Sequence, residues 1–275
     1  MAAREIPERI ARLTRPVVRA LAACKDVRGV LCFGSLAMGT ADRHSDVDLY
    51  VFCRPRIPPQ PRRRSIYEAL PALSALKLNY SPPDQWWPEQ DKFRLRRRTF
   101  DLAYNTTDWV QTVVSKVLDG AARVPELRHR PHKLLGLLDH SIALHDPDGL
   151  LAGLSASLYP YPERLRERLI AESLSSLEER LASLLDIAHR GIGNSAFLWE
   201  LGCLADALLD LLFAINRRHA PATRRPEQDL RTLDLLPPRL AERYEAILIG
   251  PFDKPGRLAA IERCRRLIED ARKLI

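Results

Sequence analysis

A short apolar run that ends in a Gly-Ser pair constrains the fold of this chain more than any other segment. Residues 30–33, Val-Leu-Cys-Phe, favour a β-strand, and after Gly34 and Ser35 the sequence Leu-Ala-Met suits the first turn of a helix. A strand-turn-helix step leaves backbone N–H groups pointing outward, and glycine lets the main chain come close to a ligand. This turn, with the Ser35 hydroxyl as a further donor, is therefore predicted to bind phosphate groups.

A second strand pattern follows at residues 46–52, Asp-Val-Asp-Leu-Tyr-Val-Phe. Its alternation places Val47, Leu49 and Val51 on the core face and both Asp46 and Asp48 on the opposite face. Two carboxylates held side by side repel each other unless a cation lies between them, and hard oxygen ligands suit Mg²⁺ or Mn²⁺. Taken alone, Asp-x-Asp is more often a strand with two solvated acids, but the Gly-Ser turn upstream favours a metal site.

Residues 100–105 form another alternating segment, in which Asp101 lies on the face opposite Phe100 and Leu102. If this strand lies beside the Asp46–Asp48 strand, Asp101 joins the acid pair. By itself, Asp101 would be an ordinary surface residue. Its predicted role as a third metal ligand therefore depends on the other two.

An apolar strand, Gly34-Ser35, a spacer, Asp46-Val47-Asp48 and the later Asp101 together resemble the DNA polymerase beta-like nucleotidyltransferase superfamily. Within it, the chain is most similar to stand-alone bacterial enzymes of the aminoglycoside adenylyltransferase type. The resemblance implies an α/β (α+β) nucleotidyltransferase domain with a mixed sheet in residues 1–150. It also implies an all-α helical-bundle domain in residues 151–275, which would complete the acceptor cleft.

The resemblance further implies transfer of a nucleoside monophosphate, AMP from ATP, to a hydroxyl of a small aminoglycoside-like acceptor, with release of pyrophosphate. Asp46, Asp48 and Asp101 would be the catalytic and metal-binding residues of a two-metal mechanism with Mg²⁺ or Mn²⁺. Gly34, Ser35 and Arg43 would bind the nucleoside triphosphate. The general base would be Asp101 or an acid of the helical domain such as Glu172.

Charge leaves the acceptor open. The net charge is +8, and the surplus of basic side chains lies in residues 1–150, where arginine runs occupy residues 54–64 and 94–98. These runs are either a solvated surface or a binding surface for RNA, so a toxin-like enzyme that modifies tRNA or protein is an alternative. A non-catalytic nucleotide-binding module is a third reading.

Helices account for most of the remaining sequence. Besides a helix near residues 66–76, leucine spacing predicts long helices from residue 162 onward, broken by Gly-Ile-Gly-Asn at 191–194. Four acids lie within these otherwise apolar helices: Glu172, Glu200, Asp206 and Asp210. They either line a cleft for a cationic acceptor or form ordinary ion pairs.

Compartment and cysteine use suggest a cytoplasmic protein without a membrane partner. Charged residues begin at Arg4, no apolar run is long enough to cross a bilayer, and the five cysteines form no C-x-x-C pair. Reduced, buried thiols are expected.

Overall fold

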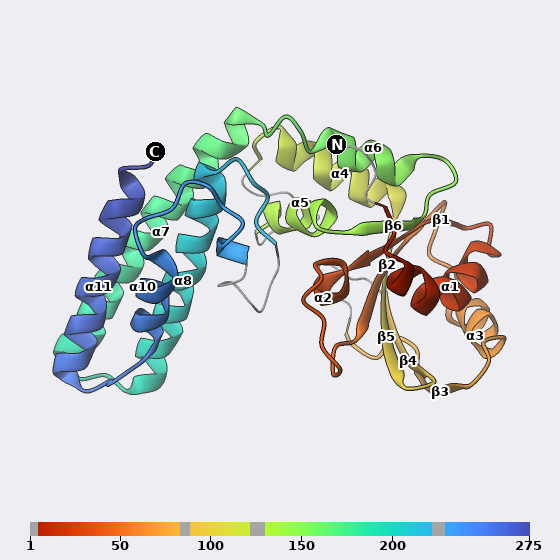
Figure 1. The fold of residues 1–275 in the computed structure, drawn as a ribbon, viewed down its shortest axis with the longest axis horizontal. Helices are drawn as coiled ribbons and strands as arrows, with labels where there is room; N and C mark the ends of the chain where they lie inside the picture. Colours follow the sequence, from red (N-terminus) through yellow and green to blue (C-terminus); the bar gives the residue numbers. More distant parts are fainter. Residues whose placement is uncertain (1–4, 83–88, 122–129, 222–228) are drawn as a thin grey trace. The chain divides into compact units, whose positions relative to one another are not determined.

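The computed structural model describes residues 5–82, 89–121, 130–221 and 229–275, in two compact units, Met1–Pro162 and Glu163–Ile275 (Figure 1). Sequence analysis placed the boundary after residue 150, which would assign helix α6 (Leu150–Ser157) to the second part. In the structure α6 belongs to the first unit. The reason is packing: a Cβ added to Gly29 would lie 3.0 Å from the Leu151 side chain, so α6 is pressed against the first β-strand.

The first unit is built on a mixed six-stranded sheet with strand order β3-β4-β5-β2-β1-β6. Strands β2 and β5 run parallel, and all other neighbours run antiparallel. This places the strands that carry Asp48 and Asp101 side by side at the centre of the sheet. The strands are β1 (Val27–Phe33), β2 (Val47–Cys53), β3 (Leu73–Lys77), β4 (Glu89–Leu95), β5 (Arg98–Thr106) and β6 (Ile142–His145).

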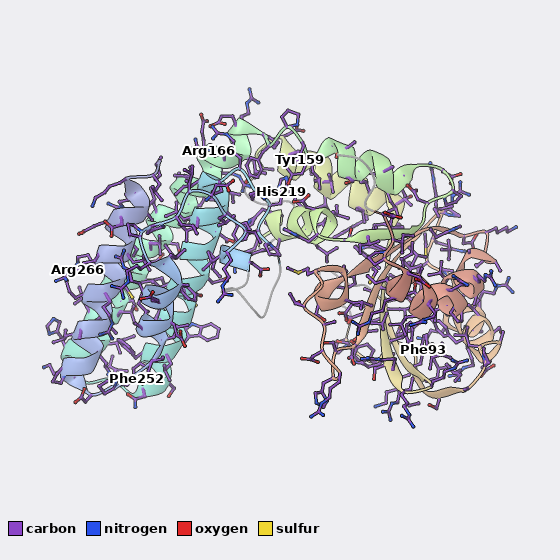
Figure 2. All side chains as sticks on the ribbon, viewed as in Figure 1. Phe93, Tyr159, Arg166, His219, Phe252 and Arg266 are labelled. Atoms are coloured by element: carbon purple, nitrogen blue, oxygen red, sulfur yellow. The ribbon has the colours of Figure 1, made fainter. Side chains whose placement is uncertain are left out.

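Helices cover both faces of this sheet (Figure 1). On one face, α1 (Glu8–Ala22) and α3 (Gln60–Glu68) pack over the apolar residues of β2 and β5, as the predicted alternation requires. Phe93 of β4 lies in this core, where its ring stacks on Phe100 at 5.5 Å between centroids (Figure 2). The opposite face carries α4 (Thr107–Leu118), α5 (His132–Asp139) and α6. The mixed α/β architecture is therefore confirmed.

The helix expected near residues 66–76 is wrong. Helix α3 begins at Gln60 and ends at Glu68, and β3 starts at Leu73. Pro71 lies between them, and a proline disfavours helical conformation in the residue that precedes it. The predicted helix thus combined the end of α3 with the start of β3.

Arg63, which lies in the run that suggested a solvated loop, is wholly buried. Its Nε donates to Asp91 Oδ2 at 2.7 Å, and its terminal nitrogens donate to the Pro58 carbonyl at 2.7 Å and to Asn79 Oδ1 at 2.8 Å. The Tyr67 hydroxyl donates to the same Asp91 oxygen at 2.8 Å. Burial is tolerated because almost every polar atom of the pair has a partner.

The second unit is helical, as predicted. Its helices are α7 (Glu163–Arg190), α8 (Asn194–Ile215), α10 (Leu240–Leu248) and α11 (Lys254–Arg272). The leucine stripe of α7 is buried at Leu165, Leu177 and Leu184, and Phe252 packs on Phe197 with 6.0 Å between ring centroids (Figure 2). Among the residues described, no helix is both long and apolar enough to cross a bilayer.

Candidate active site

The Gly-Ser turn lies directly against the Asp-bearing strand. Phe33, the last residue of β1, is the register partner of Asp48 on β2, and α2 (Gly34–Ala37) begins at the next residue. Gly34 has φ +68°, and a Cβ on it would lie only 2.5 Å from Asp48 Oδ2. Glycine is therefore needed at position 34 for two reasons: the positive φ of its backbone and the close approach of the Asp48 carboxylate.

This contact gives a testable result. We expect Gly34→Ala to displace the Asp48 carboxylate, because no Cβ fits at 2.5 Å from an oxygen. Gly39→Ala is the matched control, since Gly39 has φ +75° and nothing within 4 Å of an added Cβ. Both variants should lose roughly 1–2 kcal/mol of stability from left-handed backbone strain. Only Gly34→Ala should also lose at least about tenfold in nucleotidyl transfer, and equal activities would contradict the placement of Asp48.

Two of the three predicted aspartates are direct neighbours in the sheet. Asp48 and Asp101 are paired in the parallel register of β2 and β5, so their side chains project from the same face. Asp46 precedes β2 by one residue, at the same edge. The side chains of Asp46 and Asp101 are 37% and 21% exposed, so both can reach a ligand.

A lysine that sequence analysis did not single out joins these acids. Lys92 of β4 is the register partner of Asp101, and its Nζ lies 3.1 Å from Asp101 Oδ2 and 3.3 Å from Asp46 Oδ2. Burial by itself would lower the pKa of Lys92, but the hydrogen bonds and negative charges of Asp101 and Asp46 outweigh it, so the pKa is raised. Lys92 is therefore a permanent positive charge between two predicted metal ligands.

Tyr80 completes the cluster. Its hydroxyl donates to Asp101 Oδ2 at 2.7 Å, and its ring lies 5.1 Å from Lys92 Nζ. Burial, followed by the hydrogen bond to Asp101, raises the pKa of Tyr80 to about 12, so the phenol stays protonated as a donor. Alternation along β4 could have indicated Lys92, whereas nothing local in the sequence indicates Tyr80.

The donor set suits a hard divalent cation, but the three carboxylates are not gathered around one point. Across the described ranges, no group of three or more His, Cys, Asp or Glu side chains is placed to hold a metal ion. Asp46 and Asp101 each direct Oδ2 to Lys92, and within the same ranges Oδ1 of each makes no hydrogen bond. Oxygen ligands therefore remain for Mg²⁺ or Mn²⁺.

The remaining predicted nucleotide ligands lie in the turn and the spacer. The Ser35 carbonyl accepts from Thr40 N at 2.9 Å, which closes the turn and leaves the Ser35 hydroxyl available. Arg43 is exposed, and its Nε donates to His44 Nε2 at 2.9 Å. The Arg43 carbonyl accepts from Arg98 at 3.3 Å, which ties the spacer to the start of β5.

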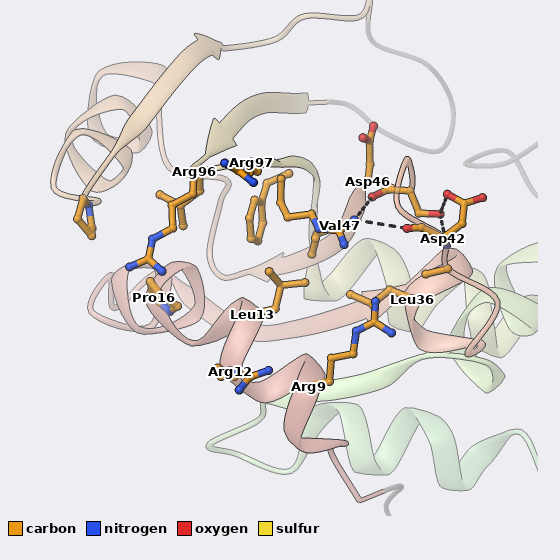
Figure 3. Close-up of a pocket in the computed structure, with 16 residues that line it drawn as sticks. Arg9, Arg12, Leu13, Pro16, Leu36, Asp42, Asp46, Val47, Arg96 and Arg97 are labelled. Carbon is orange, nitrogen blue, oxygen red and sulfur yellow. Dashed lines mark hydrogen bonds between the residues drawn. The ribbon is translucent and has the colours of Figure 1, made fainter.

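A cavity of about 640 Å³ adjoins the acid cluster at Asp46, on the α1 side of the sheet (Figure 3). Its lining includes the apolar residues Leu13, Leu36 and Phe100 and the acids Asp42 and Asp46. Five arginines line it, two from α1, two from the β4–β5 turn and one from the start of β5; they are Arg9, Arg12, Arg96, Arg97 and Arg98. Of these five arginines, only Arg98 makes a hydrogen bond or ion pair through its guanidinium to residues that the structure describes.

Two of the four acids singled out in the helical unit pair with arginines of that unit. Glu172 lies 3.5 Å from Arg168, and Glu200 accepts a hydrogen bond from Arg180 at 2.9 Å. Asp206 and Asp210 also have interaction partners, and Asp210 is buried. The ordinary ion-pair interpretation of Glu172 and Glu200 therefore fits better than a negatively charged lining for a cationic acceptor.

Comparisons with known proteins find a family model that matches part of the chain. Residues 16–103 match the family model described as a nucleotidyltransferase domain, and this stretch holds the Gly-Ser turn and all three aspartates. The match supports the predicted nucleotidyltransferase domain over these residues. No curated protein matches. Among solved structures, the chain is similar to a nucleotidyltransferase-like protein from Exiguobacterium sibiricum, with 14% identity, a TM-score of 0.42, and coverage of 96% of this chain and 78% of that one. So distant a likeness supports no conclusion about substrate.

Proposed function

We propose that the protein transfers a nucleoside monophosphate from a nucleoside triphosphate to a hydroxyl group and releases pyrophosphate. The observation that carries this proposal is the juxtaposition of Gly34, Asp48 and Asp101: the turn touches the first carboxylate, which is in register with the second. A turn for phosphate next to carboxylates for a cation is the arrangement that nucleotidyl transfer needs. The match of residues 16–103 to a nucleotidyltransferase domain supports the same reaction.

Each residue has a defined part in this proposal. Backbone amides at Gly34 and Ser35 would bind the triphosphate, with Arg43 as a further cation for it. Asp46 and Asp48 would hold Mg²⁺ or Mn²⁺, which when bound would neutralise charge on the phosphate oxygens. Asp101 would orient the acceptor hydroxyl and accept its proton through Oδ1, since its Oδ2 is engaged by Tyr80 and Lys92.

The bonds in this step balance. The acceptor oxygen forms a bond to the α-phosphorus, and the bond from the α-phosphorus to the oxygen that bridges to the β-phosphate breaks. Pyrophosphate leaves with that electron pair, and the hydroxyl proton goes to the base. We propose ATP as the donor, because the adenylyltransferase-type resemblance implies it.

Two acceptor classes compete. An aminoglycoside-like small molecule follows from the resemblance, but such a cation would be repelled by the arginine-lined cavity beside Asp46. RNA, the second candidate, has the opposite charge and could place backbone phosphates along Arg9 and Arg12. The cavity therefore supports a phosphate-bearing acceptor better than a polycationic one.

The test supplies each α-labelled nucleoside triphosphate with Mg²⁺ or Mn²⁺ and offers aminoglycosides, lincosamides, total tRNA and a cell lysate in parallel. We expect labelled RNA, and we expect Arg9→Glu/Arg12→Glu to reduce that labelling at least about tenfold, because phosphate contacts dominate the affinity for nucleic acids. Arg19→Glu on the same helix is the control, since Arg19 is exposed and lies outside the cavity. If an aminoglycoside is labelled and the substitutions do not reduce that labelling, the small-molecule function is assigned instead. If no acceptor is labelled, the protein is a nucleotide-binding module without catalytic activity.

A further inference from the structure

The Lys92 ammonium lies between two carboxylates of the candidate site, which would repel each other without it. Its ammonium bridges Oδ2 of Asp101 at 3.1 Å and Oδ2 of Asp46 at 3.3 Å. Tyr80 holds the same Asp101 oxygen at 2.7 Å and places its ring 5.1 Å from the ammonium. The lysine side chain is 32% exposed, so solvent only partly screens these contacts. The lysine is thus fixed from three sides.

The bridge divides the carboxylate oxygens into two groups. One oxygen each of Asp46 and Asp101 is bound to Lys92, whereas Oδ1 of Asp46 has no hydrogen bond from described residues and β2 places Asp48 two residues further along the same face. A divalent ion that binds Asp46 through Oδ1 and Asp48 would therefore leave the Lys92 bridge in place. A second divalent ion between Asp46 and Asp101 would have to displace the ammonium, because like charges repel at this distance.

We propose that Lys92 is a positioning residue whose ammonium is one of the two cations at this site, so that the protein binds one divalent ion and not two. Its ammonium orients Asp101 toward the acceptor hydroxyl and offsets the repulsion among the three carboxylates. The part of this inference that concerns the divalent ion rests on the proposed nucleotidyl transfer. The part that concerns charge balance does not.

Charge balance is tested on the full-length protein without metal. We expect Lys92→Met to lower the melting temperature by roughly 2–4 °C, and Lys92→Met/Asp101→Asn to recover most of that loss because the unopposed carboxylate is gone. Arg94→Met is the matched control: Arg94 is exposed on the same face of β4, and its guanidinium makes no ion pair with any residue described. Lys92→Gln provides a second variant of smaller structural effect. Additive losses in the double variant would overturn the counter-ion role.

The number of bound metal ions tests the part of the proposal that concerns the divalent ion. Mn²⁺ binding is counted by electron paramagnetic resonance in the presence of a non-hydrolysable ATP analogue with a methylene bridge between the α- and β-phosphates. We expect one ion for the wild-type protein and for Arg94→Met, and two for Lys92→Met. Two ions in the wild type, none in the wild type, or an unchanged count in Lys92→Met would each overturn the inference.

The outcomes separate this inference from the proposed function. A protein that transfers nucleotide but binds two ions would refute the role of Lys92 and leave nucleotidyl transfer standing. A protein that binds one ion, gains a second in Lys92→Met and labels no acceptor would support Lys92 and count against transfer.

Discussion

Asp48→Asn is expected to reduce nucleotidyl transfer by at least about 10³-fold, the largest effect on activity that the structure predicts. Asp48 is flanked in register by Phe33 at the end of the Gly-Ser strand and by Asp101 on β5, so it lies between the phosphate-binding turn and the third carboxylate. Asparagine has nearly the same size but no charge to balance a divalent cation. The binding of the triphosphate with its metal should fail while the fold stays intact.

The measurement is transfer of label from an α-labelled nucleoside triphosphate, with thermal unfolding run in parallel. Asp119→Asn makes the same chemical change at an exposed position after the end of α4 and should leave activity within about twofold of wild type. If Asp48→Asn retained more than a tenth of wild-type transfer, the metal-binding role assigned to this carboxylate would be untenable. A melting temperature that fell sharply would instead show that Asp48 supports the fold.

Sequence patterns were sufficient for the centre of the first unit. Alternation in residues 46–52 and 100–105 assigned each side chain to its face, and the parallel pairing of β2 with β5 then brought Asp48 and Asp101 together. Such patterns work because side chains that face the core must be apolar, as Val47, Leu49 and Val51 are; further along β2 the opposite face is buried too, at Tyr50 and Phe52. The long helices of the second unit followed from leucine spacing for the same reason.

Features that depend on distant partners were not predictable in this way. Lys92 appears in the sequence as one more basic residue before an arginine run, and its role follows only from the antiparallel register that sets it opposite Asp101. Arg63 lies among prolines and arginines that suggest solvent exposure, yet Asp91, twenty-eight positions away, makes it a core residue. Local pattern cannot report a counter-ion that another strand supplies.

Arg63→Met is expected to destabilise the first unit by about 3–5 kcal/mol, the largest stability effect we predict. The substitution leaves the fully buried Asp91 carboxylate without its guanidinium partner, although Tyr67 still donates to Oδ2 and the Asn79 backbone N–H donates to Oδ1 at 3.1 Å. A charge buried without a counter-ion costs more than the lost hydrogen bonds. Arg63→Met/Asp91→Leu should recover much of the loss, because it removes both charges together.

Amide hydrogen exchange of peptides from β2 and β5 measures the free energy of opening for the first unit alone, separately from the helical unit. Arg64→Met is the neighbouring control; its guanidinium is 53% exposed and lies 3.6 Å from Glu68, so we expect a change below about 0.5 kcal/mol. Equal effects of the two variants would refute a structural role for the buried pair.

The network also reaches the site, because Asp91 points into the core and the next residue, Lys92, points to the acids. Loosening Arg63 should therefore release β4 and weaken the Lys92 bridge, so that metal binding changes together with stability.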